Sequence, residues 1–227
     1  MKKFLDIFMS VVMLVVVFYV SFFAISTKGT EEAGPVTIYI DAGHGGIDPG
    51  KVSSKGIQEK DINLAISALL KEKFEQNGYR VVMTREDDHG LYEDTDINKK
   101  ASDMKKRCEL VKDGKAVMIS IHQNSFSDSS VKGAQVFYYS HSNDGKKLAQ
   151  NVQSAIKEKA DPDNTRKVKA NDSYYLLLHT ACPTIIVECG FLSNEEEARM
   201  LMTEEYQQKI CEAICDGTIK YIETGTK

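Results

Sequence analysis

Short apolar runs alternate with amphipathic stretches along most of the chain. β-branched apolar runs that end at glycine or polar clusters predict strands at 36–41, 79–84, 116–122, 134–140 and 184–188. Apolar residues at helical spacing predict helices at 59–76, 96–112, 144–159, 195–202 and 204–221. Strands that alternate with helices predict an α/β fold with a largely parallel sheet between layers of helices.

The longest apolar run lies near the N-terminus. After two lysines, residues 7–25 are apolar apart from two serines, which approaches the ~20 residues that a helix needs to cross a bilayer. A signal peptide, with residues 24–26 as its cleavage site, is the alternative, although its apolar stretch is normally about 7–15 residues. We expect 1–26 to be an uncleaved anchor, 27–35 a tether, and 36–222 one extracytoplasmic domain, because the lysines favour a cytoplasmic N-terminus.

Composition narrows the classes of protein. The chain has 227 residues of which 42% are hydrophobic, so it is long and apolar enough for a globular domain and is not a disordered chain. It has 29 basic and 33 acidic residues and a net charge of −4, which argues against nucleic acid as a partner. Its five cysteines form no CxxC pair, so neither a disulfide framework nor a cysteine-rich zinc site is expected.

Histidines and carboxylates follow several of the predicted strands. His44 lies among four glycines after the first strand, His122 ends the third, and Glu188 ends the last. Ligand sites of open α/β sheets lie beyond the carboxyl ends of the strands, so these side chains should meet at one rim, with Glu59 packed back toward it. Two histidines and one carboxylate are a common zinc ligand set, and a second carboxylate can transfer a proton. The residues alone leave open which carboxylate has which role.

Each of these residues also has a structural interpretation. His44 could be a turn histidine, His122 a hydrogen-bonded core residue, and Glu59 a favourable charge in the first turn of a helix. For Glu188, a carboxylate that closes a buried strand is costly unless it is paired or functional. Cys189 is predicted to be a buried thiol and not the nucleophile of a cysteine hydrolase, since neighbours on a strand point in opposite directions.

Four segments carry a more specific pattern. They are DAGHGGIDPG at 41–50, EKDINL at 59–64, SIHQN at 120–124 and VECGFLSN at 187–194. In this order and spacing they resemble the zinc-dependent N-acetylmuramoyl-L-alanine amidases of the amidase-3 type, over about 37–221. The resemblance implies a three-layer α/β/α sandwich around a twisted mixed sheet. It also implies Zn²⁺ held by His44, Glu59 and His122, with Glu188 as the catalytic acid/base.

The resemblance further implies a substrate and a setting. The substrate is peptidoglycan, cleaved at the amide between the lactyl group of N-acetylmuramic acid and L-alanine. The short architecture resembles the germination-specific amidases of the spore cortex, which implies extracytoplasmic action on the forespore side, before a polysaccharide deacetylase completes muramic-δ-lactam formation. An extracytoplasmic activating protein is a candidate partner. The rival functions are a zinc peptidase or deacetylase acting on the cell wall, and a catalytically silent peptidoglycan-binding module.

The sequence gives weaker indications of a role for several further side chains. Asn124 follows His122 closely enough to reach a substrate. Arg166 lies in a basic segment and could bind a carboxylate of a stem peptide. His179 follows an apolar stretch and could line the cleft, whereas Arg85 and Arg107 are expected to form structural ion pairs.

Overall fold

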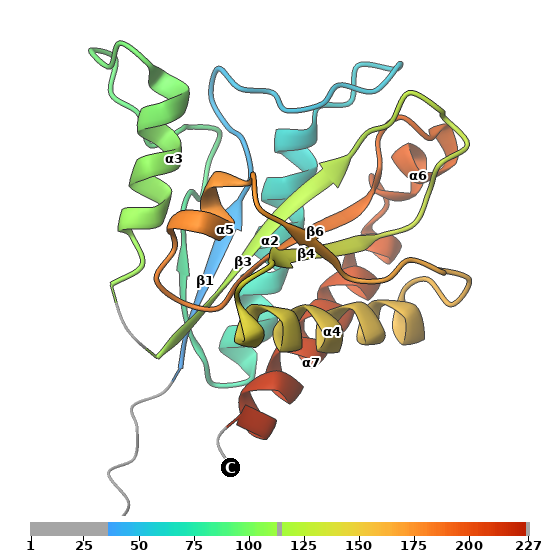
Figure 1. The fold of residues 1–227 in the computed structure, drawn as a ribbon. Coiled ribbons are helices and arrows are strands. Elements are labelled where there is room, and N and C mark those ends of the chain that lie inside the picture. Colours follow the sequence, from blue (N-terminus) through green and yellow to red (C-terminus); the bar gives the residue numbers. More distant parts are fainter. Residues whose placement is uncertain (1–35, 113–114, 226–227) are drawn as a thin grey trace, which may run out of the picture. The chain divides into compact units, whose positions relative to one another are not determined.

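The computed structural model describes residues 36–112 and 115–225 (Figure 1). The strands are β1 Thr37–Ala42, β2 Arg80–Met83, β3 Ala116–Asn124, β4 Gln135–Tyr139, β5 Lys169–Asn171 and β6 Thr184–Phe191. The helices are α2 Glu59–Gln76, α3 Lys99–Glu109, α4 Asn143–Lys159, α5 Tyr175–His179, α6 Glu195–Met200 and α7 Glu204–Gly225. The anchor and tether expected at 1–26 and 27–35 lie outside the described residues. Within the described part, no helix has the length and apolar character needed to span a bilayer.

The strands form one six-stranded sheet in the order β2-β1-β3-β6-β4-β5. Every neighbouring pair is parallel except β4 and β6, which are antiparallel. The helices α2, α4 and α7 cover one face and pack on a large apolar core, while α3 and α5 lie over the opposite face (Figure 1). The predicted three-layer α/β/α sandwich around a mostly parallel, mixed sheet is therefore confirmed.

Alternation along β1 supplies both layers of the core. Ile38 and Ile40 are fully buried beneath α2 and α7, whereas Tyr39 between them packs in the smaller cluster on the α3 side. On the face covered by α2, α4 and α7, the helices α4 and α7 pack so closely that a Cβ at Gly217 would lie 2.6 Å from the Cα of Val152. A glycine at 217 therefore permits this close helix contact.

The observed elements differ from the predicted ones mainly at their ends. The helix 59–76 has the predicted bounds. The helix predicted at 96–112 begins only at Lys99, because the side chain of Asn98 caps it by accepting a hydrogen bond from Ala101 N. The strand predicted to end at Glu188 continues to Phe191 beside β3. The sequence pattern did not predict β5 or α5, which are three and five residues long.

Candidate active site

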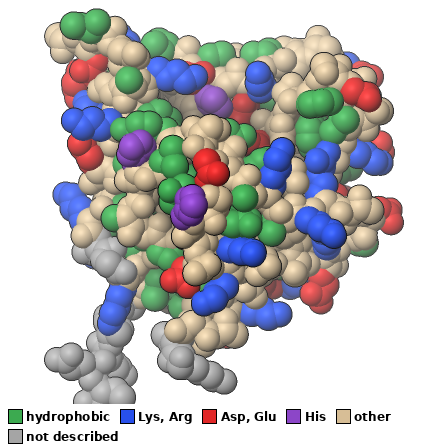
Figure 2. Space-filling model, viewed as in Figure 1, with side chains coloured by type: hydrophobic (Ala, Val, Ile, Leu, Met, Phe, Trp, Pro, Cys, Tyr) green, Lys and Arg blue, Asp and Glu red, His purple; other side chains and the backbone are tan. Residues whose placement is uncertain are grey.

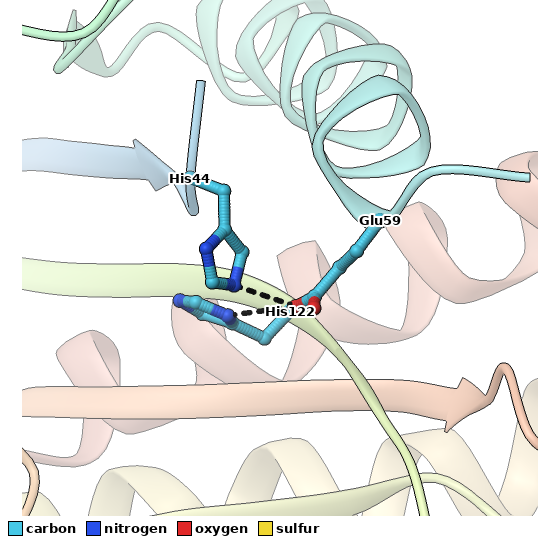
Figure 3. Close-up of side chains that lie close together, drawn as sticks. All are labelled: His44, Glu59 and His122. Carbon is cyan, nitrogen blue, oxygen red and sulfur yellow. Dashed lines mark hydrogen bonds and ion pairs between the residues drawn. The ribbon is translucent and has the colours of Figure 1, made fainter. Parts of the chain in front are cut away.

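His44, Glu59 and His122 meet at the carboxyl ends of β1 and β3, beside the first turn of α2 (Figure 3). Glu59 Oε1 lies 3.2 Å from His44 Nε2 and 2.9 Å from His122 Nδ1. One ligand atom from each residue lies within 4.8 Å of the others. The sequence predicted this convergence because all three elements end or begin at one rim of the sheet.

The loop after β1 fixes the orientation of the His44 ring. His44 has φ 63°, a left-handed conformation that is uncommon for a residue with a side chain. The loop is closed by two backbone hydrogen bonds between Gly45 and Asp48. Asp48 Oδ2 then lies 3.0 Å from His44 Nδ1 and 3.2 Å from Lys100 Nζ. Because Nδ1 faces this carboxylate, Nε2 is the nitrogen that faces Glu59.

Two glycines are needed where the loop passes the site. A Cβ at Gly43 would lie 2.4 Å from the His122 ring, so the ring can approach the backbone this closely only because residue 43 has no side chain. Gly50 has φ 68°, and a Cβ at this position would lie 2.6 Å from Glu59 Oε2 and from the His44 ring. Both glycines therefore allow the loop to approach the cluster closely.

Glu59 is held as an ionised carboxylate. Its Oε2 accepts a hydrogen bond from Lys51 N at 2.8 Å, and its Oε1 accepts one from Gln123 N at 2.9 Å. Burial alone raises the pKa of Glu59, but hydrogen bonds and charge from His122 and His44 outweigh it and lower the pKa below its ordinary value. Burial lowers the pKa of His122, but the Glu59 carboxylate reverses this and raises that pKa to about 9.

Glu188 lies across from His122 in the pairing of β3 with β6. Its side chain is 7% exposed, and its Oε2 has no hydrogen-bond partner among the described residues. Burial raises the pKa of Glu188 to about 7, although the charge of His122 opposes the shift. Cys189 is fully buried in the core cluster on the other face, as predicted, so it is not placed as a nucleophile.

The buried side chain of Arg107, from α3, connects several groups at this rim of the sheet. Its guanidinium donates to Asp41 Oδ1 and to Asp103 Oδ2, both at 2.6 Å, which confirms the predicted ion pairing. It also donates to the carbonyl oxygens of Ala42 at 2.8 Å and His44 at 2.6 Å. The buried arginine thereby holds the backbone from which His44 projects.

Arg85 corrects one expectation. It forms no ion pair with the described residues and instead donates to the carbonyl oxygens of Ala42 at 2.9 Å, Gly43 at 3.2 Å, Lys60 at 2.7 Å and Asp87 at 2.8 Å. The predicted ion pairing is wrong, because the guanidinium lies where the end of β1, the first turn of α2 and the segment after β2 meet, and its donors satisfy the carbonyl groups of all three.

The cluster and Glu188 open into a cavity of about 760 Å³. Asn124 lies in its wall, so this residue is placed where a substrate contact was expected. Tyr92, from the segment before α3, and Tyr174, which precedes α5, also line the cavity. The cavity is thus lined by aromatic residues together with the polar residues of the cluster, a mixture typical of ligand sites.

Two candidate residues lie outside the described lining of the cavity. Arg166 donates to the Lys132 carbonyl at 2.7 Å and to Gln135 Oε1 at 3.3 Å. His179 is exposed, and its ring lies 4.1 Å from that of Tyr175. Contact of Arg166 with a part of the substrate beyond the cavity stays a prediction.

The cluster fits a catalytic metal ion. Two imidazole nitrogens and one carboxylate oxygen form a donor set that suits zinc and leaves a fourth position for water or substrate. The sequence did not single out Asp48, although it lies four residues after His44 inside the same glycine-rich segment. A carboxylate on the second nitrogen of a ligand histidine is a common way to fix its tautomer.

Comparison of the chain with known proteins identifies the family to which this fold and site belong. Residues 38–220 match the family model Amidase_3, N-acetylmuramoyl-L-alanine amidase, so the chain belongs to this family of peptidoglycan amidases. The resemblance drawn from the four sequence segments is thus confirmed.

Individual members of the family show which amidases the chain is similar to. The chain is 35% identical over 188 residues to the germination-specific N-acetylmuramoyl-L-alanine amidase of Bacillus subtilis, covering 81% of this chain and 78% of that protein. The CwlD amidase of Clostridioides difficile, solved in complex with the GerS lipoprotein, is 42% identical with a TM-score of 0.80, covering 83% and 99% of the two chains. An N-acetylmuramoyl-L-alanine amidase from Clostridium difficile 630 is 32% identical with a TM-score of 0.75, covering 85% and 99%. The predicted likeness to germination-specific amidases is confirmed.

Proposed function

We propose that this amidase is zinc-dependent, with His44, Glu59 and His122 as the metal ligands and Glu188 as the acid/base. The observation that carries the proposal is the location of the His-Glu-His cluster and a buried, incompletely hydrogen-bonded carboxylate in one cavity. When bound, zinc supplies a Lewis acid and a water molecule of lowered pKa. The substrate bond is the amide between the lactyl group of N-acetylmuramic acid and L-alanine.

Glu188 moves the proton in this reaction. Its carboxylate accepts a proton from the attacking water while that water's oxygen bonds to the lactyl carbonyl carbon. The same carboxyl group then gives the proton to the L-alanine nitrogen as the C–N bond breaks. A carboxyl group with a pKa near the working pH can do both, and the burial of Glu188 acts to raise its pKa from the ordinary value toward that range.

The test is a product analysis with the full chain on purified peptidoglycan. We expect new L-alanine amino termini and free lactyl carboxyl groups, loss of both after chelator treatment, and recovery with added zinc. New amino termini at another stem-peptide residue would indicate a peptidase, and released acetate a deacetylase. Binding without any product, also in the presence of zinc and the candidate activating protein, would indicate a silent wall-binding module.

We further propose a role in the spore cortex, supported by the likeness to the germination-specific amidase. The enzyme would remove stem peptides from the forespore side, so that a polysaccharide deacetylase can complete muramic-δ-lactam formation. Residues 1–26 would hold it at the membrane. Deleting the gene should abolish muramic-δ-lactam in spores and leave the vegetative wall unchanged; spores with normal lactam content contradict this role.

An extracytoplasmic activating protein belongs to the same proposal. It is supported by the relative that was solved together with a lipoprotein. Zinc titration of the full chain, alone and with the corresponding lipoprotein of its own organism, should show tighter metal binding in the mixture. Equal affinity and equal cleavage rates in both samples would argue against such a partner.

A further inference from the structure

The basic side chains that line the cavity differ in their partners. Arg107 is paired with Asp41 and Asp103, and Lys100 is paired with Asp48. Lys51 also lines the cavity and is exposed, and no carboxylate among the described residues lies within 4.0 Å of its ammonium group. Of these three cations, Lys51 is therefore the one with a charge left for a ligand.

The main chain of Lys51 is fixed next to the candidate metal ligands. Its N–H donates to Glu59 Oε2 at 2.8 Å, and its carbonyl oxygen accepts a hydrogen bond from Glu59 N at 2.9 Å. A β-bridge between Val52 and Gln58 closes the same loop. The side chain of Lys51 thus begins at a defined position beside the Glu59 carboxylate, and its flexible four-carbon stem is long enough to bring the ammonium group to a ligand in the cavity.

We propose that Lys51 binds the free carboxylate of the second residue of the stem peptide and so sets the substrate preference of the enzyme. This inference rests on the proposed function. The reacting amide must lie beside Glu59 and Glu188, and two residues of extended chain span at most about 7 Å. The carboxylate of the second residue, a D-glutamate attached to L-alanine, therefore stays within reach of a lysine anchored beside Glu59.

On the face of the molecule seen in Figure 2, charges of one sign do not gather. Figure 2 shows acidic and basic side chains mixed over the face seen in Figure 1, with exposed apolar side chains between them. A mixed surface does not create the strong single-sign field that would hold an anionic peptide without specific contacts. Discrimination between a carboxylate and its uncharged amide then depends on an individual cation such as Lys51.

Two synthetic substrates separate the charge of the ligand from its shape. Both are N-acetylmuramoyl-L-alanine compounds with a D-glutamyl second residue whose γ-carboxyl group is capped as a methylamide. The α-carboxylate of that residue is free in the glutamate substrate and is an amide in the isoglutamine substrate. With the full chain, Lys51→Met should lower kcat/KM for the glutamate substrate about tenfold, mainly through KM, because it removes a charge-assisted hydrogen bond. It should leave the isoglutamine substrate unchanged, and Lys51→Arg should keep most of the preference.

Lys55→Met is the matched control. Lys55 lies on the same loop and is exposed, but it is paired with Glu195 at 2.5 Å and does not line the cavity. We expect no change with either substrate. Unchanged turnover of the isoglutamine substrate by Lys51→Met shows that this variant is folded.

Three results would overturn the inference. They are an equal loss on both substrates, no loss on the glutamate substrate, and an equal loss in the Lys55→Met control. A wild-type chain that, supplied with zinc and the candidate activating lipoprotein, frees no L-alanine amine from either substrate or from peptidoglycan rejects the proposed function itself and, with it, the role of Lys51. Cleavage by the wild type with no charge-dependent effect rejects the role of Lys51 alone.

Discussion

Two buried carboxylates flank β3 at the same rim of the sheet, and their surroundings differ sharply. Asp41 of β1 is 2% exposed and accepts hydrogen bonds from Arg107 at 2.6 Å, Thr84 at 2.8 Å and Ser120 at 2.5 Å. Burial acts to raise the pKa of Asp41, but Arg107 and the other donors reverse this and lower the pKa to about 2. Asp41 is therefore a permanent anion and serves as a structural anchor.

Glu188 of β6 is buried to a similar extent but lacks such partners. One of its oxygens has no hydrogen bond within the described part of the chain, and burial raises its pKa to about 7. The difference shows that partners, not burial, decide what a carboxylate at this rim can do. A fully satisfied carboxylate holds the backbone in place, and an unsatisfied one is available for proton transfer.

The largest expected effect is on catalysis at Glu188. Glu188→Gln keeps the size of the side chain and removes its ability to accept a proton, so the rate of amide cleavage should fall about 10²–10⁴-fold. Bound zinc, measured by atomic absorption, should stay unchanged because Glu188 is not a proposed ligand. Glu195→Gln, an exposed neighbour, should cleave at the wild-type rate. A Glu188→Gln variant with full activity would remove Glu188 from the mechanism.

The structural role of Asp41 is tested by a substitution of its partner Arg107. Arg107→Met leaves Asp41 buried without its main partner, and breaking a buried pair from one side costs about 3–5 kcal/mol in free energy of unfolding. Urea denaturation measures this. Lys105→Met on the same helix, where an exposed lysine lies 3.6 Å from Glu109, should change stability by less than about 0.5 kcal/mol. A loss below about 1 kcal/mol for Arg107→Met would show that Asp41 does not depend on this pair.

Local sequence patterns predicted much of this region. The bounds of α2 followed from apolar residues at helical spacing and from Asn77-Gly78 at its end, where Gly78 takes φ 81°. The meeting of His44, Glu59 and His122 followed from the rule that parallel strands bring their carboxyl ends to one edge. These features depend only on periodicity and on the direction of the strands.

Other features depend on contacts between distant residues. Arg107 and Asp41 are 66 positions apart, and nothing in either segment specifies which charges will pair. The carbonyl contacts of Arg85 depend on how the end of β1, the first turn of α2 and the segment after β2 come together, which the sequence pattern does not define. Strand β5 and helix α5 span only three and five residues, so they are too short to show a period.

A third carboxylate, Asp48, is intermediate between the fully hydrogen-bonded Asp41 and the incompletely hydrogen-bonded Glu188. It is partly exposed, and it acts through His44. Asp48→Asn weakens the hydrogen bond that holds Nδ1 and directs Nε2 toward the cluster, so the zinc affinity should fall about 10–100-fold. Competition with a zinc-binding dye measures the dissociation constant without reference to activity. The matched control is Asp87→Asn, since Asp87 lies 3.0 Å from the exposed His89 outside the cavity. Equal affinity in both variants would limit Asp48 to a loop-closing role.

The smallest expected effect concerns the stability of the metal-free protein and has opposite signs at the two carboxylates. Asp41 has a lowered pKa, so its contribution is present above about pH 4 and is lost as the pH falls toward 2. Glu188 has a raised pKa, so folding favours its protonated form, and stability declines as the pH rises from about 4.5 to 7.

Glu188→Gln should remove this second decline. In chelator, the variant and the wild type should unfold at similar urea concentrations at pH 4.5, where Glu188 is protonated in the folded protein. At pH 8 the variant should be more stable by roughly 1–3 kcal/mol, since each pKa unit corresponds to about 1.4 kcal/mol. The residue whose removal abolishes cleavage would then be one that destabilises the fold at working pH. If the difference in free energy of unfolding between the two proteins did not depend on pH, ionisation of Glu188 would not destabilise the fold. The contrast with Asp41 would then be wrong.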